Sequence, residues 1–230
     1  MPKLLNIKHV FFDLDHTLWD FDKNSKRTYA YIFEKNHINV NINVFDKVYK
    51  PINHRYWKLY REEKVTQKEL KYGRLKDTFD ALNYKISNEV ITVLGKEYLE
   101  NLSNYNALFK GTIELLDYLK SKYILHIVTN GFSEIQEAKL KKSGIFSYFD
   151  EVITSEFVQV KKPNPKIFFY ALQQAKAYTY ESVMIGDNLE ADILGAINTG
   201  IKAIHCNFTD DKSHEKIITV SALSQIKQYL

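Results

Sequence analysis

The sequence contains few of the residues that cross-link small extracellular domains or bind soft metal ions. Of its 230 residues, one is cysteine (Cys206), four are proline and eight are glycine. A single cysteine forms no disulfide within the chain and excludes a zinc or iron–sulfur site built on several thiolates. The low proline and glycine content excludes a collagen-like or low-complexity chain.

Long apolar runs are also missing. No stretch approaches the roughly 20 apolar residues that a membrane helix needs. Near the N-terminus, Lys8 and His9 interrupt the apolar residues and Asp13 ends them, so the core of a signal peptide is too short. The sequence therefore predicts a cytoplasmic protein with no membrane partner.

A strong charge of one sign is absent as well, because 32 Lys and Arg against 28 Asp and Glu give a net charge of +4. Between positions 44 and 85, however, eleven Lys and Arg stand against six Asp and Glu. This stretch is typical of lysine-rich solvated helix faces, or of a positive field over an anionic substrate. Arg55, Arg61 and Arg74 are candidate anion contacts, with the helix surface as the alternative for each. No nucleic-acid-binding motif accompanies them, and we expect no nucleic-acid partner.

The pattern of apolar residues changes along the chain. The segment 9–14 is a short buried strand by its run of apolar and aromatic residues. The following stretch has apolar residues at helical spacing and predicts four helices, at 23–36, 43–64, 67–82 and 88–102. Pro51 is expected to kink or offset the second of them.

Strands and helices alternate after Gly111. We expect strands at 124–129, 150–154, 182–186 and 201–206, and helices at 112–121, 133–143, 165–176, 188–199 and 221–229. This alternation predicts an α/β fold with a Rossmann-like parallel sheet and helices on both faces. The helical block follows the first strand, so it is an insertion. We predict a core domain from 1–17 and 108–230 and an inserted helical domain at 18–107.

Acidic residues stand where the predicted strands end. Asp13 and Asp15 close the first strand, and Asp187 directly follows the strand at 182–186. Sites in open parallel sheets form at the carboxyl ends of the strands, so we expect these side chains to meet at one edge. Asp192 lies about one helical turn beyond Asp187 and is expected at the same edge.

The first pair of acids indicates a metal site. Asp13 and Asp15 are two positions apart, so in an extended chain their carboxylates point the same way. Crowded carboxylates repel each other, and a divalent cation relieves that repulsion. With Asp187 they form an all-oxygen donor set that suits Mg²⁺. Taken alone, an Asp-x-Asp sequence is equally typical of a turn or a helix cap.

A hydroxyl group follows the second strand. The segment Thr129-Asn130-Gly131 can present a hydroxyl and backbone N–H groups to a phosphate. In isolation the same residues are also typical of a strand-to-helix turn in which Ser133 caps the helix. The segment is therefore a candidate phosphate contact that needs support from its neighbours.

A lysine precedes the helix at 165–176. Lys162 stands before Pro163, which favours an extended backbone at the lysine. A lysine held there would neutralise the charge of a phosphoryl group, although an exposed surface lysine is the simpler interpretation. Spacing alone does not separate Lys162 from Lys161.

Together these segments resemble the haloacid dehalogenase-like (HAD) hydrolase superfamily, in the subgroup with a helical cap inserted after the first motif. The four motifs occur in order over essentially the whole chain: Phe12-Asp13-Leu14-Asp15-His16-Thr17-Leu18, Thr129-Asn130-Gly131, Lys162-Pro163-Asn164-Pro165, and Gly186-Asp187-Asn188 to Asp192-Ile193. In the third motif the lysine directly before proline is the functional one, which favours Lys162. His16 departs from the pattern, in which Asp, Gly or Glu is more common.

The resemblance implies phosphoryl transfer through an aspartyl-phosphate. It assigns Asp13 as the nucleophile and Asp15 as the acid that protonates the leaving oxygen and later takes a proton from water. Thr129 and Lys162 bind the phosphoryl oxygens. The second aspartate excludes the haloalkanoate dehalogenases, which lack it. It argues for a phosphatase or a phosphomutase, and we expect hydrolysis because no feature of the chain calls for a bound bisphosphate.

The resemblance also implies a Mg²⁺ ion held by Asp13, Asp187 and the backbone carbonyl of Asp15. Asp192 is expected just outside those ligands, where it orients water or Lys162. Backbone N–H groups of Leu14 and Asn130 are further candidate phosphate contacts.

The segment Leu18-Trp19-Asp20-Phe21-Asp22, with Asn24-Ser25 after it, resembles the pyrimidine 5'-nucleotidase branch of the superfamily. We therefore expect a small phosphorylated metabolite as substrate, first of all a nucleoside 5'-monophosphate. Trp19 or Phe21 would stack on the base or pack within the protein. A sugar phosphate or phosphoglycolate is the alternative substrate, and a non-catalytic binding protein on the same scaffold is the alternative from another class. The sequence allows a monomer or a homodimer.

Overall fold

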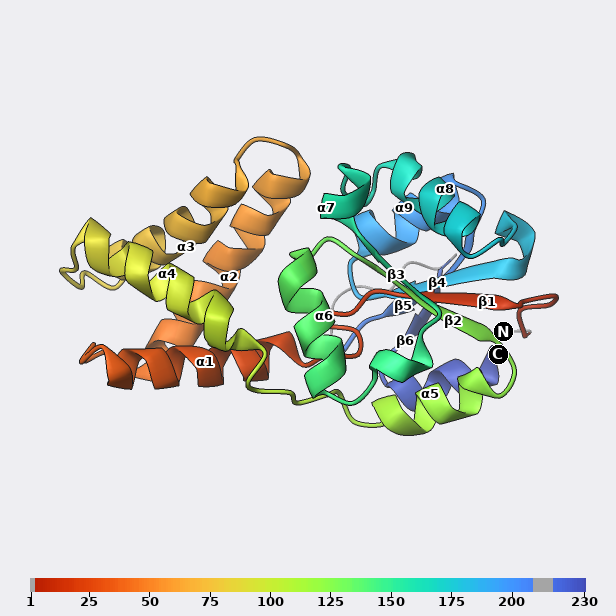
Figure 1. The fold of residues 1–230 in the computed structure, drawn as a ribbon, viewed down its shortest axis with the longest axis horizontal. Coiled ribbons are helices and arrows are strands. Elements are labelled where there is room, and N and C mark those ends of the chain that lie inside the picture. Colours follow the sequence, from red (N-terminus) through yellow and green to blue (C-terminus); the bar gives the residue numbers. More distant parts are fainter. Residues whose placement is uncertain (1–2, 209–216) are drawn as a thin grey trace. The chain divides into compact units, whose positions relative to one another are not determined.

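The computed structural model describes residues 3–208 and 217–230, and it contains a six-stranded sheet (Figure 1). All neighbouring strands are parallel, in the order β3-β2-β1-β4-β5-β6. The strands are β1 (His9–Phe12), β2 (Ile124–Thr129), β3 (Glu151–Thr154), β4 (Ser182–Gly186), β5 (Lys202–Cys206) and β6 (Ile218–Val220). The predicted α/β fold with a parallel sheet and a helical insertion between its first two strands is confirmed.

Helices cover both faces of the sheet. Figure 1 shows α5 (Thr112–Lys120) on one side and α8 (Pro165–Gln174) with α9 (Gly195–Asn198) on the other. The central strands are buried throughout because both of their faces are covered, which explains their continuous apolar sequences. On the α8 side, Phe11, Val128 and Met184 of the three central strands pack in one cluster with the apolar residues of that helix.

Shorter elements complete this part of the chain. Helix α6 (Ser133–Lys142) follows β2, and α7 (Ser155–Val158) follows β3. Three 3₁₀ helices span Phe146–Tyr148, Thr179–Glu181 and Leu223–Gln228, and a π-helical turn spans Leu189–Leu194. No helix in the described ranges is both long enough and apolar enough to cross a bilayer.

The described chain divides into two compact units, one of residues 1–21 with 106–230 and one of residues 22–105. The helices between β1 and β2 are α1 (Phe21–Lys35), α2 (Ile42–Arg61), α3 (Gln67–Ala81) and α4 (Asn88–Leu102). Side-chain caps fix where three of them begin: Asn41 caps α2, Thr66 and Glu69 form a capping box on α3, and Ser87 caps α4. Helix α2 continues through Pro51.

The structure differs from the sequence-based expectations at five places. The helix expected at 188–199 is a π-helical turn followed by α9, and the one expected at 221–229 is a 3₁₀ helix. Strand β6 and helix α7 were not expected, because three or four residues are too few to establish a hydrophobic period. The first strand ends at Phe12 instead of Leu14, since the chain turns after Asp13.

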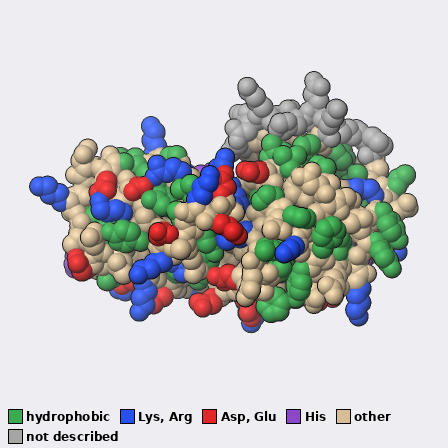
Figure 2. All heavy atoms as spheres, turned by 90° about the horizontal axis from the view of Figure 1, so that it is seen from above, with side chains coloured by type: hydrophobic (Ala, Val, Ile, Leu, Met, Phe, Trp, Pro, Cys, Tyr) green, Lys and Arg blue, Asp and Glu red, His purple; other side chains and the backbone are tan. Residues whose placement is uncertain are grey.

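Basic side chains of the 44–85 stretch are interleaved with acids. Arg55 pairs with Asp77, and Lys76 pairs with Asp80. Figure 2 shows red and blue side chains next to each other on the face it presents. The interpretation as solvated helix faces therefore fits Arg55, and no single basic patch marks this face.

Arg74 does not fit the surface interpretation. Its side chain is 2% exposed and lies over the rings of Tyr98 and Tyr49, at 5.1 and 5.9 Å from their centroids. It donates a hydrogen bond of 2.9 Å to Asn53 Oδ1. Tyr29 stacks on Tyr98, so aromatic rings surround the guanidinium in the interior of the 22–105 unit. Cation–π contacts of this kind stabilise the guanidinium charge, which water would stabilise at the surface.

Two histidines form a buried pair on β1 and β2. His9 Nδ1 and His126 Nε2 lie 3.1 Å apart, so one ring nitrogen donates to the other, and the rings stack. Burial, reinforced by the neighbouring His9, lowers the pKa of His126 to about 4, although Asp150 acts in the opposite direction. The folded protein therefore keeps His126 neutral at pH values where the unfolded chain binds a proton.

Acidification is expected to destabilise the fold through this pair. The unfolded chain takes up a proton near pH 6.5 and the folded protein only near pH 4, so stability falls as pH falls through that window. The loss from His126 is about 3 kcal/mol. Urea unfolding between pH 7 and pH 4 measures it. His126→Phe should flatten the profile and the exposed His37→Gln should not; an unchanged slope in His126→Phe would contradict this assignment.

Candidate active site

Three carboxylates meet beyond the carboxyl ends of β1 and β4. Asp13 follows β1, Asp187 follows β4, and Asp192 lies on the π-helical turn. One oxygen from each lies within 4.8 Å of the others. Because β1 and β4 are neighbours in the sheet, residues far apart in the sequence are brought to one edge, as the strand ends predicted.

One buried lysine faces this acidic cluster. Lys162 Nζ lies 2.7 Å from Asp13 Oδ1, 2.7 Å from Asp192 Oδ1 and 2.6 Å from the carbonyl oxygen of Val128. A single ammonium group leaves the three carboxylates with an excess of negative charge.

Burial raises the pKa values of two of these acids. For Asp13, burial acts most strongly; Lys162 opposes it, and Asp192 and Asp187 add to it. Burial and Asp192 raise the pKa of Asp187 to about 8, again against Lys162. Carboxylate oxygens in excess of the local cations, partly shielded from water, form the donor set that a hard divalent cation such as Mg²⁺ takes. These residues therefore fit the expected ion.

The side chain of Asn130 fixes the backbone of Lys162. The Lys162 N–H donates to Asn130 Oδ1 at 2.8 Å, and Asn130 Nδ2 donates to the Lys162 carbonyl at 3.0 Å. The Lys162–Pro163 peptide bond is cis. Of the two adjacent lysines, Lys162 reaches the carboxylates, as the third motif predicted. The sequence suggested a backbone contact for Asn130, and this use of its side chain was not expected.

Two residues outside the predicted set hold Asp187. Thr17 Oγ1 donates to Asp187 Oδ1 at 3.3 Å, and His205 Nε2 donates to the Asp187 carbonyl at 2.8 Å. Thr17 belongs to the first motif, so its hydroxyl was a signal that sequence reasoning left unused. His205 lies near the end of β5, which pairs with β4. A polar residue at that strand end is the sequence signal that could have identified it.

Gly186 makes room for Asp192. A Cβ atom at position 186 would lie 2.3 Å from Asp192 Oδ2, which leaves no space for any larger residue. The same Asp192 oxygen accepts the backbone N–H of Asn188 at 3.0 Å. The glycine therefore sets where the carboxylate stands relative to Lys162.

We expect Gly186→Ala to lower kcat by about 10²-fold, because it displaces Asp192 and through it Lys162. Steady-state kinetics and thermal unfolding of the variant measure the effect. Gly95→Ala is the matched control, since a Cβ there meets its nearest atoms at the ordinary distance of 3.8 Å. Full activity in Gly186→Ala would show that the position of Asp192 is unimportant.

Asp15 lies apart from the three-carboxylate cluster. Its two carboxylate oxygens accept hydrogen bonds from Lys139 Nζ at 2.6 and 2.9 Å, and Gln136 Nε2 donates to one of them at 3.0 Å. The carboxylates of Asp13 and Asp15 thus have different partners, since Asp13 accepts a hydrogen bond from Lys162. The chain leaves the extended conformation after β1 and turns sharply, with His16 at φ 61°.

The remaining predicted residues are also placed at this edge. Thr129 Oγ1 accepts hydrogen bonds from Gln136 Nε2 at 2.6 Å and from the Gly131 N–H at 3.1 Å. The Leu14 side chain is completely buried, so a contact with phosphate would fall to its backbone. Trp19 is also completely buried, and the Lys139 ammonium lies 4.4 Å from its ring, which favours packing within the protein over stacking on a base.

Comparisons with known proteins agree with this arrangement. A family model described as haloacid dehalogenase-like hydrolase matches residues 7–200. The pyrimidine 5'-nucleotidase YjjG of Escherichia coli is 32% identical over 96% of both chains. The glyceraldehyde 3-phosphate phosphatase of Methanothermobacter thermautotrophicus is also 32% identical, over 97% of this chain and 100% of its own.

A solved structure is similar over nearly the whole length. The crystal structure of the putative HAD-hydrolase YfnB from Bacillus subtilis, bound to magnesium, has a TM-score of 0.87 and 26% identity, covering 96% of this chain and 97% of that one. The ordered motifs, the sheet that brings them together and the match over residues 7–200 lead to one assignment. The chain belongs to the haloacid dehalogenase-like hydrolase family.

Proposed function

We propose that the protein is a Mg²⁺-dependent phosphomonoester hydrolase that works through an aspartyl-phosphate. The observation that carries the proposal is the cluster of Asp13, Asp187 and Asp192 around the buried ammonium of Lys162. The cluster combines a nucleophile with cationic binding of a transferring phosphoryl group. The nucleophile Asp13 and the metal ligands Asp15 and Asp187 are all present, which argues against the non-catalytic alternative.

Each residue has a definite part in the proposed reaction. An Asp13 oxygen attacks phosphorus while the bond from phosphorus to the leaving oxygen breaks, and that oxygen takes a proton from Asp15. A water molecule then attacks the same phosphorus and gives a proton to Asp15. The bond between phosphorus and Asp13 breaks, which restores the carboxylate and releases inorganic phosphate. Thr129 and Lys162, with the backbone of Leu14 and Asn130, bind the phosphoryl oxygens.

The metal ion would be held by Asp13, Asp187 and the Asp15 carbonyl, with Asp192 next to them orienting Lys162. When bound, Mg²⁺ supplies positive charge that neutralises the phosphoryl oxygens. The 2.7 Å contact between Lys162 and Asp192 supports the positioning role of that acid.

As substrate we propose a pyrimidine nucleoside 5'-monophosphate. The 18–22 segment and the resemblance to two pyrimidine 5'-nucleotidases, from Escherichia coli and Streptococcus pneumoniae and each 32% identical, support this choice. The inserted segment 18–107 would act as the cap that selects the substrate. A sugar or triose phosphate is the second candidate, because a glyceraldehyde 3-phosphate phosphatase is equally similar in sequence.

Phosphate release from a panel of esters tests the proposal. The panel contains pyrimidine and purine nucleoside monophosphates, glyceraldehyde 3-phosphate, sugar phosphates and phosphoglycolate, each with Mg²⁺ and with EDTA. We expect Mg²⁺-dependent release that is fastest from the pyrimidine nucleotides. Turnover of the other esters alone would reject the nucleotidase assignment, and no turnover of any ester would reject the enzyme.

Mg²⁺ is expected to stabilise the protein more at high than at moderate pH. Because burial raises the pKa of Asp187 to about 8, the folded, metal-free protein holds a proton there that the unfolded chain has lost, and its stability falls as pH rises towards that value. The ion displaces this proton, so its binding weakens as pH falls below about 8. Thermal unfolding with Mg²⁺ and with EDTA should differ more at about pH 8.5 than at about pH 6.5. If Mg²⁺ raises the unfolding temperature equally at both pH values, the site is contradicted. A pH-dependent rise that persists in Asp187→Asn would contradict it as well.

A further inference from the structure

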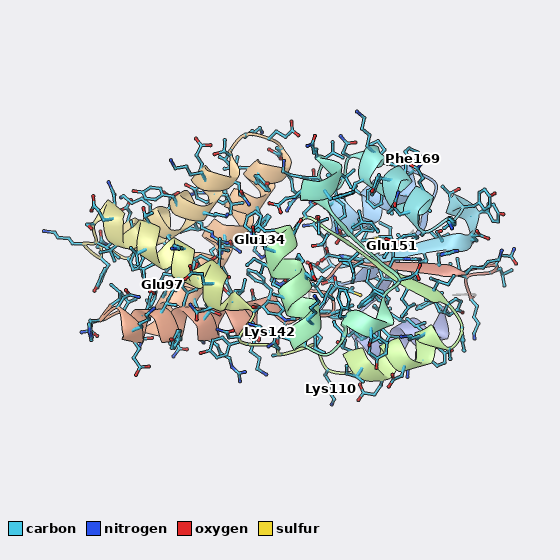
Figure 3. All side chains as sticks on the ribbon, in the orientation of Figure 1. Glu97, Lys110, Glu134, Lys142, Glu151 and Phe169 are labelled. Carbon is cyan, nitrogen blue, oxygen red and sulfur yellow. The ribbon has the colours of Figure 1, made fainter. Side chains whose placement is uncertain are left out.

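Helix α6 carries two buried polar side chains that the proposed mechanism does not use. Gln136 is 0% exposed and Lys139 is 2% exposed. Figure 3 labels Glu134 and Lys142 near the two ends of this helix, and the buried pair lies between them in the sequence. Three residues apart, Gln136 and Lys139 share one face of the helix. A buried ammonium and a buried amide need partners of matching polarity, and both are found at Asp15.

Lys139 forms an ion pair with the carboxylate of Asp15. Its Nζ lies 2.6 Å from Asp15 Oδ1 and 2.9 Å from Oδ2, so it donates to both oxygens. The same ammonium lies 4.4 Å from the ring centroid of Trp19 and 5.4 Å from that of Phe21. Charge-assisted hydrogen bonds and cation–π contacts together restrict the lysine to one position.

Gln136 links Asp15 to the phosphate-binding hydroxyl. Its Nε2 donates to Asp15 Oδ2 at 3.0 Å and to Thr129 Oγ1 at 2.6 Å, which uses both amide hydrogens. A carboxylate only accepts, so the nitrogen must face Asp15. Gly131 permits this placement, because a Cβ there would lie 2.4 Å from the amide of Gln136.

Asp15 stands outside the strands of the sheet, in an isolated bridge with Trp19. It stands beyond the end of β1 and directly before His16, whose φ of 61° marks a sharp turn. Its carboxylate accepts hydrogen bonds from two side chains of α6, Lys139 and Gln136. This contrasts with Asp13, whose backbone N–H donates to Ile185 of the neighbouring strand at 2.9 Å.

We propose that Lys139 and Gln136 are positioning residues that hold the Asp15 carboxyl group for proton transfer to the leaving oxygen. The inference rests on the proposed function, in which Asp15 is the acid. Gln136 joins this acid to Thr129, so proton donor and phosphate-binding hydroxyl keep a fixed separation. Gly131 of the second motif then serves to admit Gln136, in addition to any contact with phosphate.

The leaving group reveals whether Asp15 is positioned correctly. An alkyl phosphate expels a strongly basic alkoxide and needs the proton, whereas p-nitrophenyl phosphate expels a stable phenolate and needs it little. We expect Lys139→Met to lower kcat/KM, which reports on the step that expels the leaving group, by about 10²-fold on an alkyl phosphate and by less than about tenfold on p-nitrophenyl phosphate. Asp15→Asn should show the same selectivity, and Lys139→Arg should recover part of the loss on the alkyl ester.

The experiment compares kcat and KM on both esters for the wild type, these variants, Gln136→Met and the control Lys141→Met. Lys141 is exposed on the same helix and pairs with Glu137, so its replacement should leave both rates unchanged. Thermal unfolding shows whether each variant is folded. If Lys139→Met does not fold, Lys139→Arg and Gln136→Met decide the question by the same comparison of the loss on the alkyl ester with the loss on p-nitrophenyl phosphate. Equal losses on the two esters, or no loss, would overturn the positioning role. A wild type inactive on both esters and on the whole substrate panel would overturn the proposed function itself.

Discussion

Asp13→Asn is expected to lower phosphate release by about 10⁴-fold or more, because the amide cannot form the bond to phosphorus. The fold should remain, since asparagine has the same shape and Lys162 can still donate to its carbonyl oxygen. The substitution also removes one of three crowded carboxylates. Burial and the two neighbouring acids raise the pKa of Asp13, so its negative charge is unfavourable in the folded protein. Without Mg²⁺, the variant should therefore unfold at the same temperature as the wild type or a higher one.

Initial rates and thermal unfolding, each with Mg²⁺ and with EDTA, measure both expectations. Asp117→Asn is a matched control, because this exposed carboxylate of α5 accepts a hydrogen bond from the Tyr148 hydroxyl far from the strand ends. Its turnover should equal that of the wild type. An Asp13→Asn variant that keeps its activity would refute the nucleophile, and one that fails to fold would refute the electrostatic account of the cluster.

Lys162→Met should lower both activity and stability. The ammonium is the cation next to Asp13 and Asp192, and its loss leaves these carboxylates and the Val128 carbonyl without their donor. Removing one partner of a buried ion pair costs about 3–5 kcal/mol of unfolding free energy. Loss of a preorganised donor to the phosphoryl group lowers kcat by about 10²- to 10³-fold.

The neighbouring lysine supplies the control. Lys161→Met changes the same charge one residue away, where the side chain is partly exposed, and it should leave kcat near the wild-type value. Urea unfolding and initial rates of the two variants separate the roles of the pair. A larger loss in Lys161→Met than in Lys162→Met would show that the third motif has been aligned on the wrong lysine.

The position of the site at one edge of the sheet could be predicted from the sequence. Asp13 and Asp187 each follow a short apolar strand, and parallel strands bring their carboxyl ends together whatever the rest of the chain does. This argument needs only strand ends, and it placed Lys162 and Asp192 in the same neighbourhood. The structure confirms that these four side chains lie together.

The side-chain partners of Asp15 could not be predicted. Alternation along a strand puts Asp13 and Asp15 on one side, but the strand ends at Phe12 and the alternation ends with it. The partners of Asp15 come from α6, more than a hundred residues away in the sequence. Spacing within a motif contains no information on such contacts, because they depend on how two elements pack.

Similar reasons explain why the interior of the inserted unit was misjudged. Arg74 lies in a basic, polar stretch, so its neighbours in sequence suggested a solvent-exposed helix face. Its burial depends on Tyr49 and Tyr98, which approach from α2 and α4. A cage of aromatic rings is a property of packed helices and has no local pattern.

The covalent intermediate tests the central claim most directly. Asp15→Asn mixed with p-nitrophenyl phosphate and Mg²⁺, quenched rapidly in acid and digested, allows peptide mass spectrometry to find a phosphoryl group. The phenolate leaves without a proton from residue 15, whereas water attack then lacks its base, so the intermediate should accumulate. The account predicts the phosphoryl group on the peptide that contains Asp13. A phosphoryl group on another residue, or full turnover with none on the chain, would contradict it.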